Sequence, residues 1–99
     1  MRIDVVGKNT EITDAIRQYG DTKASKLLKY YDRIQLITIR VTKANASHTS
    51  EFEAELILDV EKHADFVSNA HGKDPYAAID LVVEKGERQL REFKERLKG

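Results

Sequence analysis

The chain has 99 residues, 40% of them hydrophobic and 34% charged, with 17 Lys and Arg against 17 Asp and Glu. This length predicts one domain with a modest core, and this composition excludes a disordered chain. The absence of Cys excludes disulfide frameworks, thiolate metal sites and thiol nucleophiles. We find no signal-peptide core and no apolar run of about 18 residues, and we therefore predict a soluble, cytoplasmic protein without a membrane segment.

The N-terminal half predicts a strand, a helix and a second strand. Residues 2–6 (RIDVV) are rich in β-branched side chains and precede the turn residues GKN. Apolar residues then recur every three or four positions, which predicts a helix over residues 13–30 with Thr10 or Thr13 as its N-cap. Residues 31–43 alternate between apolar and polar, as a half-buried strand does.

The C-terminal half predicts two more strands and a long helix. After a polar loop (residues 44–50), residues 51–61 (EFEAELILDVE) alternate between apolar and acidic side chains, which predicts a strand with one core face and one acidic face. Residues 66–72 form a shorter strand. Asp74 then caps a helix that begins at Pro75, whose predicted core side carries Ile79, Val83, Leu90, Phe93 and Leu97. Gly86 lies on the same side, and we expect it to admit the first helix closely or to mark a bend.

These elements predict an α+β fold of order β-α-β-β-β-α in a single domain over residues 1–99. Two amphipathic helices and a sheet with one apolar face pack most simply with both helices on that face. The strand-helix-strand start requires a right-handed crossover, which makes the first two strands parallel neighbours. The later strands follow as hairpins, so the four-stranded sheet is mixed and its other face meets solvent.

A net charge of zero argues against nucleic-acid binding unless the charges are segregated. The third strand is expected to hold five carboxylates on the solvent face, which leaves 17 bases against 12 acids elsewhere. They are Glu51, Glu53, Glu55, Asp59 and Glu61. The net charge therefore conceals an excess of positive charge on the rest of the molecule.

On a helical wheel the charges of the last helix separate into two flanks. The basic flank has Lys85, Arg88, Gln89 and Arg96, and the acidic flank has Asp80, Glu84 and Glu87. The first helix adds a basic strip of Lys23, Lys26 and Lys29. Facing each other across a groove, the two basic sides would make a positive furrow suited to a phosphate backbone. Solvated faces with ordinary i to i+4 ion pairs are the commoner explanation of such a pattern.

No pattern of catalytic or metal-binding residues emerges. The three His (His48, His63, His71) are isolated in the sequence, and the Ser residues 47, 50 and 68 lack a nucleophile elbow. The alternating carboxylates are more simply a solvated strand face than an acid-base pair. Tyr30 and Tyr31 continue the apolar stripe of the first helix, which favours packing over base stacking. We therefore predict a protein that is not an enzyme and needs neither metal nor cofactor.

Four phrases in the sequence resemble the bacterial ribosome hibernation-promoting factors and ribosome-associated inhibitors in order and spacing. They are VVGKNTEITDAIRQY, KASKLLKYYDRI, HTSEFEAELIL and DPYAAIDLVVEKGERQL. The most specific part is D-x-Y-A-A-I-D-x-x-x-x-K-x-x-R-Q-L from Asp74 to Leu90, together with the earlier E-I-T-x-A-I-R. The resemblance covers nearly the whole chain and fits the short form of the family or the N-terminal domain of the long form.

The resemblance implies a fold similar to double-stranded-RNA-binding domains and binding to the small ribosomal subunit near the decoding centre. There the protein would compete with mRNA and tRNA and silence translation in idle, stressed or stationary-phase cells. The rRNA-binding positions that it implies are Lys23, Lys26, Lys29, Lys85, Arg88, Gln89 and Lys94. The sequence departs from the family pattern at Gly86, at the acidic Glu92 and in its low overall basicity. The free protein is expected to be a monomer or a weak homo-oligomer.

Two other functions fit the same patterns. The acidic sheet face or an exposed edge strand would suit a protein-interaction module that recruits a basic partner. A generic double-stranded-RNA-binding domain would share the fold and the basic helices.

Overall fold

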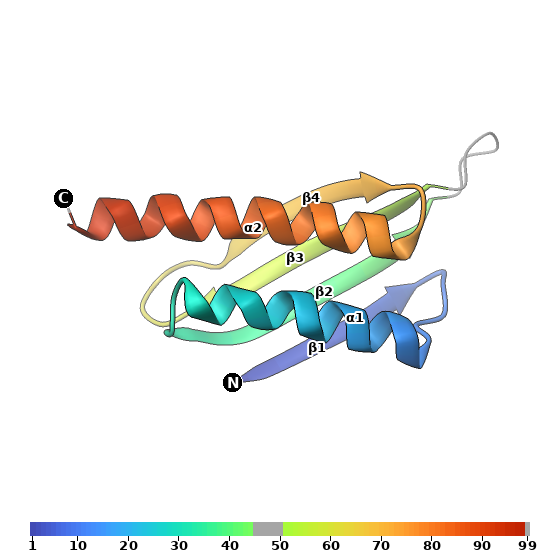
Figure 1. Ribbon diagram of the computed structural model, residues 1–99, viewed down its shortest axis with the longest axis horizontal. Coiled ribbons are helices and arrows are strands. Elements are labelled where there is room, and N and C mark those ends of the chain that lie inside the picture. Colours follow the sequence, from blue (N-terminus) through green and yellow to red (C-terminus); the bar gives the residue numbers. More distant parts are fainter. Residues whose placement is uncertain (45–50, 99) are drawn as a thin grey trace.

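The computed structural model describes residues 1–44 and 51–98, which form a four-stranded sheet with both helices on one face (Figure 1). In chain order the elements are β1 (Arg2–Lys8), α1 (Asp14–Ser25), the 3₁₀ helix η1 (Lys26–Lys29), β2 (Ile34–Lys43), β3 (Phe52–Val60), β4 (Phe66–Gly72) and α2 (Pro75–Lys98). The predicted α+β order is confirmed, although β1 runs two residues further than expected. Ser47, His48, Ser50 and most of the predicted polar loop lie outside the described residues.

The strand order is β1-β2-β3-β4, so β1 and β4 are the two edges of the sheet. β1 runs parallel to β2, with Val5 opposite Ile39, as the right-handed crossover predicts. β2 pairs with β3, and β3 with β4, in antiparallel register. The mixed sheet expected from the sequence is therefore confirmed.

α1 begins as predicted and ends earlier. The Thr13 side-chain oxygen accepts a hydrogen bond from the Ile16 backbone N–H at 3.2 Å, which makes Thr13 the N-cap. The predicted helix over residues 13–30 becomes 3₁₀ after Ser25, as is common at the C-terminus of an α-helix, and the fully buried Leu27 lies in this last turn. The Tyr30 and Tyr31 N–H groups both donate to the Leu27 carbonyl, at 3.0 and 3.2 Å, and end the helix.

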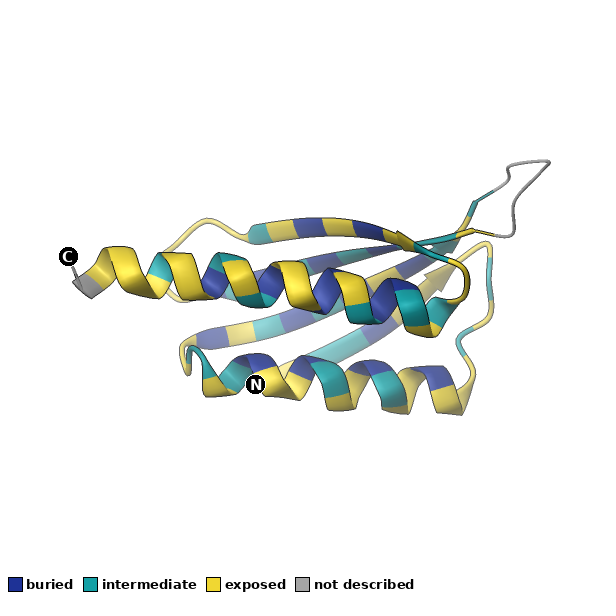
Figure 2. Cartoon of the chain, turned by 45° about the horizontal axis from the view of Figure 1, so that its top comes forward, coloured by how far each residue is buried: buried dark blue, intermediate teal, exposed yellow. Residues whose placement is uncertain are grey.

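α2 begins where the sequence places it, since the Asp74 carboxylate accepts a hydrogen bond from the Ala77 N–H at 2.9 Å. Ile79, Val83 and Leu90 are buried, and Figure 2 shows that the buried positions of α2 lie along the inner side of the helix. Leu97, which was predicted on the core side, is 61% exposed. The prediction was wrong because the last turns of α2 extend past the end of the sheet (Figure 1). No helix in the described ranges is long and apolar enough to cross a membrane.

Gly86 is buried where α2 crosses β3. A Cβ atom built on Gly86 would overlap Cδ2 of Leu56, a fully buried residue of β3. The expected close approach therefore exists, but α2 makes it with the sheet and not with the first helix.

β3 is one residue shorter at each end than the predicted third strand. Glu51 and Glu61 lie outside β3, so the strand itself contributes only three carboxylates to this face, those of Glu53, Glu55 and Asp59. Glu55 pairs with Arg40 of β2 at 2.8 Å, and Glu53 lies 3.3 Å from His71 of β4. Arg40 therefore offsets one of the three negative charges that β3 places on this face.

Candidate nucleic-acid interface

The predicted RNA-binding residues lie in three separate places on the helix layer. Lys23 and Lys26 line a cleft between the two helices. Lys29 and Lys94 line a second cleft where η1 meets the C-terminal part of α2. Lys85, Arg88 and Gln89 line a third, shallow cleft between α2 and β4.

The cleft between the helices, of ≈ 250 Å³, mixes positive and negative charge. Opposite Lys23 and Lys26, it is lined by the acidic flank of α2, which consists of Asp80, Glu84 and Glu87. The Lys23 ammonium lies 3.4 Å from the Asp80 carboxylate. The predicted positive furrow is therefore wrong, because the basic flank of α2 faces β4 and its acidic flank faces α1.

Asp80 joins the two helices through a small polar network. The Tyr19 hydroxyl donates to Oδ1 of Asp80 at 2.7 Å, and the Lys23 ammonium lies 5.4 Å from the centroid of the Tyr19 ring. The hydrogen bond with Asp80 raises the pKa of Lys23, and the carboxylate charge adds to that effect. Asp80 also raises the pKa of Tyr19, because its carboxylate accepts the phenol proton in a hydrogen bond. Lys23 is thus charged but already has a partner.

Side chains on the flank of α2 beside β4 donate hydrogen bonds to this edge strand of the sheet. Lys85 donates to the Asn69 carbonyl at 2.6 Å, and the Gln89 amide donates to the Val67 carbonyl at 3.3 Å. Ser68, which is only 6% exposed, donates its hydroxyl proton to the Gln89 side-chain oxygen at 2.8 Å. Lys85 and Gln89 therefore have structural partners in the free protein, and Arg88 beside them is exposed.

The cleft at the end of the helices, of ≈ 520 Å³, collects more positive charge. Lys29 and Lys94 share it with Arg33 and with one acidic residue, Asp32. Its apolar lining comes from Leu28, Tyr30, Tyr31 and Leu97. Sequence reasoning missed Arg33, although its place in the KASKLLKYYDRI phrase, just past the helix, was a usable signal.

Aromatic rings pack around this end of the molecule. Tyr31 meets Phe93 edge-on, with 5.5 Å between the ring centroids, so it packs as the sequence predicts. The Tyr30 pKa is raised by a hydrogen bond to Glu87, which holds the phenol in its protonated form. His63 stacks on Phe66, with 4.6 Å between the ring centroids.

Within residues 1–44 and 51–98, no three His, Asp or Glu side chains cluster as metal ligands.

Comparison with known proteins identifies the family. The model of the Sigma 54 modulation protein / S30EA ribosomal protein family matches residues 3–98. The ribosome hibernation promoting factor of Escherichia coli K12 is 37% identical over 98 residues, covering 99% of this chain and 98% of that protein. The factor of the same name from Azotobacter vinelandii is 35% identical over 96 residues, covering 97% of this chain and 85% of that protein.

Two solved structures have folds similar to that of this chain. The crystal structure of the Thermus thermophilus Protein Y N-terminal domain superposes with a TM-score of 0.81 at 32% identity, covering 94% of this chain and 99% of that one. A ribosomal subunit interface protein from Coxiella burnetii shares the fold, with a TM-score of 0.84 at 22% identity, covering 96% of this chain and 99% of that one. The resemblance to hibernation factors found in the sequence is thus confirmed, and the chain belongs to the Sigma 54 modulation protein / S30EA ribosomal protein family.

Proposed function

We propose that this protein is a cytoplasmic, non-enzymatic ribosome hibernation factor that binds the rRNA of the small subunit near the decoding centre. It would exclude mRNA and tRNA by occupancy and so silence translation in idle cells. The observation that carries the proposal is the 37% identity to a ribosome hibernation promoting factor over 98 residues, nearly the full length of both chains. No reaction chemistry is needed, because blocking requires only binding.

The arrangement of charges supports contact through the helix layer. Lys26, Lys29, Arg88 and Lys94 are exposed, and among the described residues none of them takes part in an ion pair. Such side chains contact phosphates without reading base sequence, which suits recognition of a folded rRNA by its shape. Lys23, Lys85 and Gln89 complete the proposed set, although they must exchange their present partners for RNA.

The test is co-sedimentation of the protein with purified bacterial ribosomes at several salt concentrations. We expect Arg88→Glu with Lys94→Glu to weaken binding strongly and to lower the log–log salt slope by about 1.5 units, because each lost phosphate contact removes about 0.7 to 0.9. The matched control is Lys8→Glu with Lys43→Glu, which makes the same change in charge at the far ends of β1 and β2. Equal losses in the two variants would contradict RNA contact through the helices.

The same assay separates the other two functions. mRNA and tRNA should displace the protein from ribosomes, whereas naked duplex RNA should compete poorly. Effective competition by duplex RNA would favour a generic double-stranded-RNA-binding domain, and the likeness to such domains stays a prediction. A protein-interaction module using the acidic sheet face would tolerate Arg88→Glu with Lys94→Glu. The pairing of Arg40 with Glu55 removes part of the negative charge that such a module would use.

A further inference from the structure

The two edges of the sheet are protected to different degrees. Beside β4, Lys85 and Gln89 donate hydrogen bonds to two edge carbonyls. Beside β1, Arg17 of α1 reaches the Val5 carbonyl at 3.4 Å, which is long for an N–H···O hydrogen bond. An edge strand presents unpaired N–H and C=O groups on which a further strand can build. β1 is therefore the more open edge of the described sheet.

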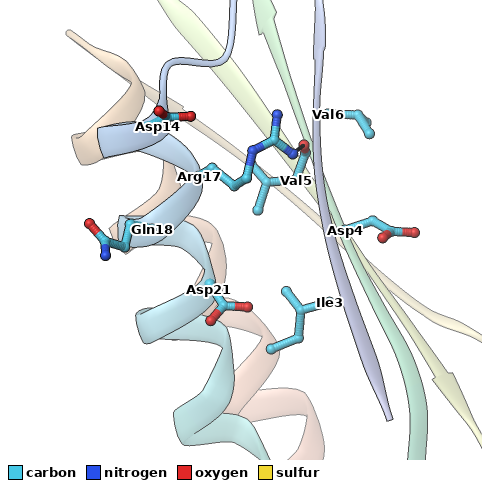
Figure 3. A pocket seen from close by; sticks show the side chains of 8 residues that line it. All are labelled: Ile3, Asp4, Val5, Val6, Asp14, Arg17, Gln18 and Asp21. Carbon is cyan, nitrogen blue, oxygen red and sulfur yellow. Dashed lines mark hydrogen bonds between the residues drawn. The ribbon is translucent and has the colours of Figure 1, made fainter.

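A cleft of ≈ 460 Å³ runs between β1 and α1 (Figure 3). The side chains of Ile3 and Val5 point toward α1, whereas those of Asp4 and Val6 point to the other side of the strand. The helix contributes Asp14, Arg17, Gln18 and Asp21 to the lining. A strand added beside β1 would therefore place one row of its side chains against α1, because side chains alternate along a strand.

The charges of the cleft favour a basic occupant. Asp14 and Asp21 are exposed, and none of the ion pairs formed within the described residues includes either of them. Arg17, between them on the helix, is the one base that lines the cleft, and its guanidinium reaches toward Val5. The third acid of the lining, Asp4, forms an ion pair with Arg2 at 2.8 Å on the far side of the strand. A chain with Lys or Arg facing α1 would therefore complement Asp14 and Asp21.

We propose that the β1 edge and this cleft bind an extended, Lys- or Arg-bearing peptide segment of another protein. The segment adds to the sheet beside β1 and points alternate basic side chains at Asp14 and Asp21. Its backbone displaces the long contact from Arg17 to Val5. This surface lies at the opposite sheet edge from Lys85 and Arg88, so the proposal stands whether or not the helices bind rRNA.

The probe is a synthetic peptide of about nine residues, a usual strand length, in which Lys alternates with Val. Titration of the labelled full chain, followed by NMR, should shift the amide signals of β1 and α1 and leave those of β4 unchanged. Contacts between backbone protons of the peptide and of β1 should identify the added strand. A peptide of the same sequence with every backbone amide N-methylated keeps the charge but lacks N–H donors, so it should bind at least about tenfold more weakly.

Variants of the cleft should change the affinity in opposite directions. Asp14→Asn with Asp21→Asn should weaken binding about fivefold, because two exposed ion pairs are lost. Arg17→Gln should tighten it, because a competing base and the contact to Val5 are both removed. Glu92→Gln with Glu95→Gln makes the same change in net charge on α2 and should alter the affinity by less than about twofold. Ribosome binding should be undiminished in all three.

Three results would overturn the proposal. Equal affinities of the N-methylated and the unmethylated peptide would show that charge attraction alone holds the peptide. Signal shifts confined to the solvent face of the sheet would place the peptide elsewhere. Failure of the peptide to bind would contradict the proposal, and a dimer seen by sedimentation velocity would then assign the β1 edge to a second copy. Circular dichroism checks that each variant folds, and Arg17→Gln decides the outcome where Asp14→Asn with Asp21→Asn does not fold.

Discussion

Gly86 sets how closely α2 approaches the sheet. The residue is buried on the inner side of the helix, over the fully buried Leu56 of β3. Glycine in a helix interior costs about 1 kcal/mol relative to alanine. The close contact with Leu56 explains why glycine is present despite this cost, because any side chain at this position would overlap the leucine.

We expect Gly86→Ala to lower the free energy of unfolding by about 1 kcal/mol, since overpacking costs about 1 to 3 kcal/mol and outweighs the gain in helix propensity. In a Leu56→Val background the obstructing methyl is absent, and the same substitution should raise stability. Urea unfolding of the four proteins of this cycle measures both signs. A gain in stability in both backgrounds would contradict the close contact.

Lys85 and Gln89 show that a sequence motif can identify a polar residue without predicting its hydrogen-bond partners. The K-x-x-R-Q-L phrase marks them as polar and near Arg88, which is confirmed by their shared cleft. The phrase does not reveal that their partners in the free protein are backbone carbonyls and a buried Ser68 on β4, 16 to 22 residues away. Such partners depend on which strand is the sheet edge, and that follows only from the assembled fold.

The elements themselves were predictable because each depends on local chemistry. Thr13 and Asp74 cap their helices as the sequence predicts, and the alternation along β2 and β3 fixes which residues face the core. The wheel of α2 also separated its acidic from its basic flank correctly. It could not tell which flank meets α1, because that depends on how the helix is rotated and placed on the sheet. The prediction of a positive furrow was wrong for this reason.

The contact of Asp80 with α1 should make the stability of the protein depend on pH in the alkaline range. The pKa values of Lys23 and Tyr19 are both raised, above all by their hydrogen bonds with Asp80, so the folded state favours their protonated forms. This contribution is complete below the unfolded pKa values of about 10, and it is lost as pH rises through the higher folded values.

We therefore expect Asp80→Asn to destabilise the protein at neutral pH and the difference from wild type to shrink above about pH 10. Urea unfolding at a series of pH values from neutral to strongly alkaline measures the difference. Asp59→Asn, on the solvent face of the sheet, is the matched control, and its effect should not change over this range. If the difference for Asp80→Asn does not change with pH, the protonation of Lys23 and Tyr19 does not contribute to stability through Asp80.

At the scale of the whole molecule, a net charge of zero results from regions of opposite sign. The end cleft with Lys29, Arg33 and Lys94 is mainly basic, and the cleft beside β1 carries Asp14 and Asp21. Between the helices the acidic flank of α2 faces Lys23 of α1 and Lys26 of η1. Composition predicts segregation of charge, but only the packed helices show that an RNA on this layer would pass over carboxylates.

The acidic flank should therefore weaken the proposed ribosome binding and make it sensitive to salt. We expect Asp80→Asn with Glu84→Gln and Glu87→Gln to tighten binding about tenfold at low salt, with the gain fading as ions screen the charges over about 10 Å. Glu53→Gln with Glu55→Gln and Asp59→Asn makes the same change in net charge on the opposite face of the sheet, so it should have much less effect. Co-sedimentation with ribosomes at several salt concentrations compares the two. Equal gains would mean that net charge alone governs affinity, whereas no gain in either would mean that the RNA does not cross the groove between the helices.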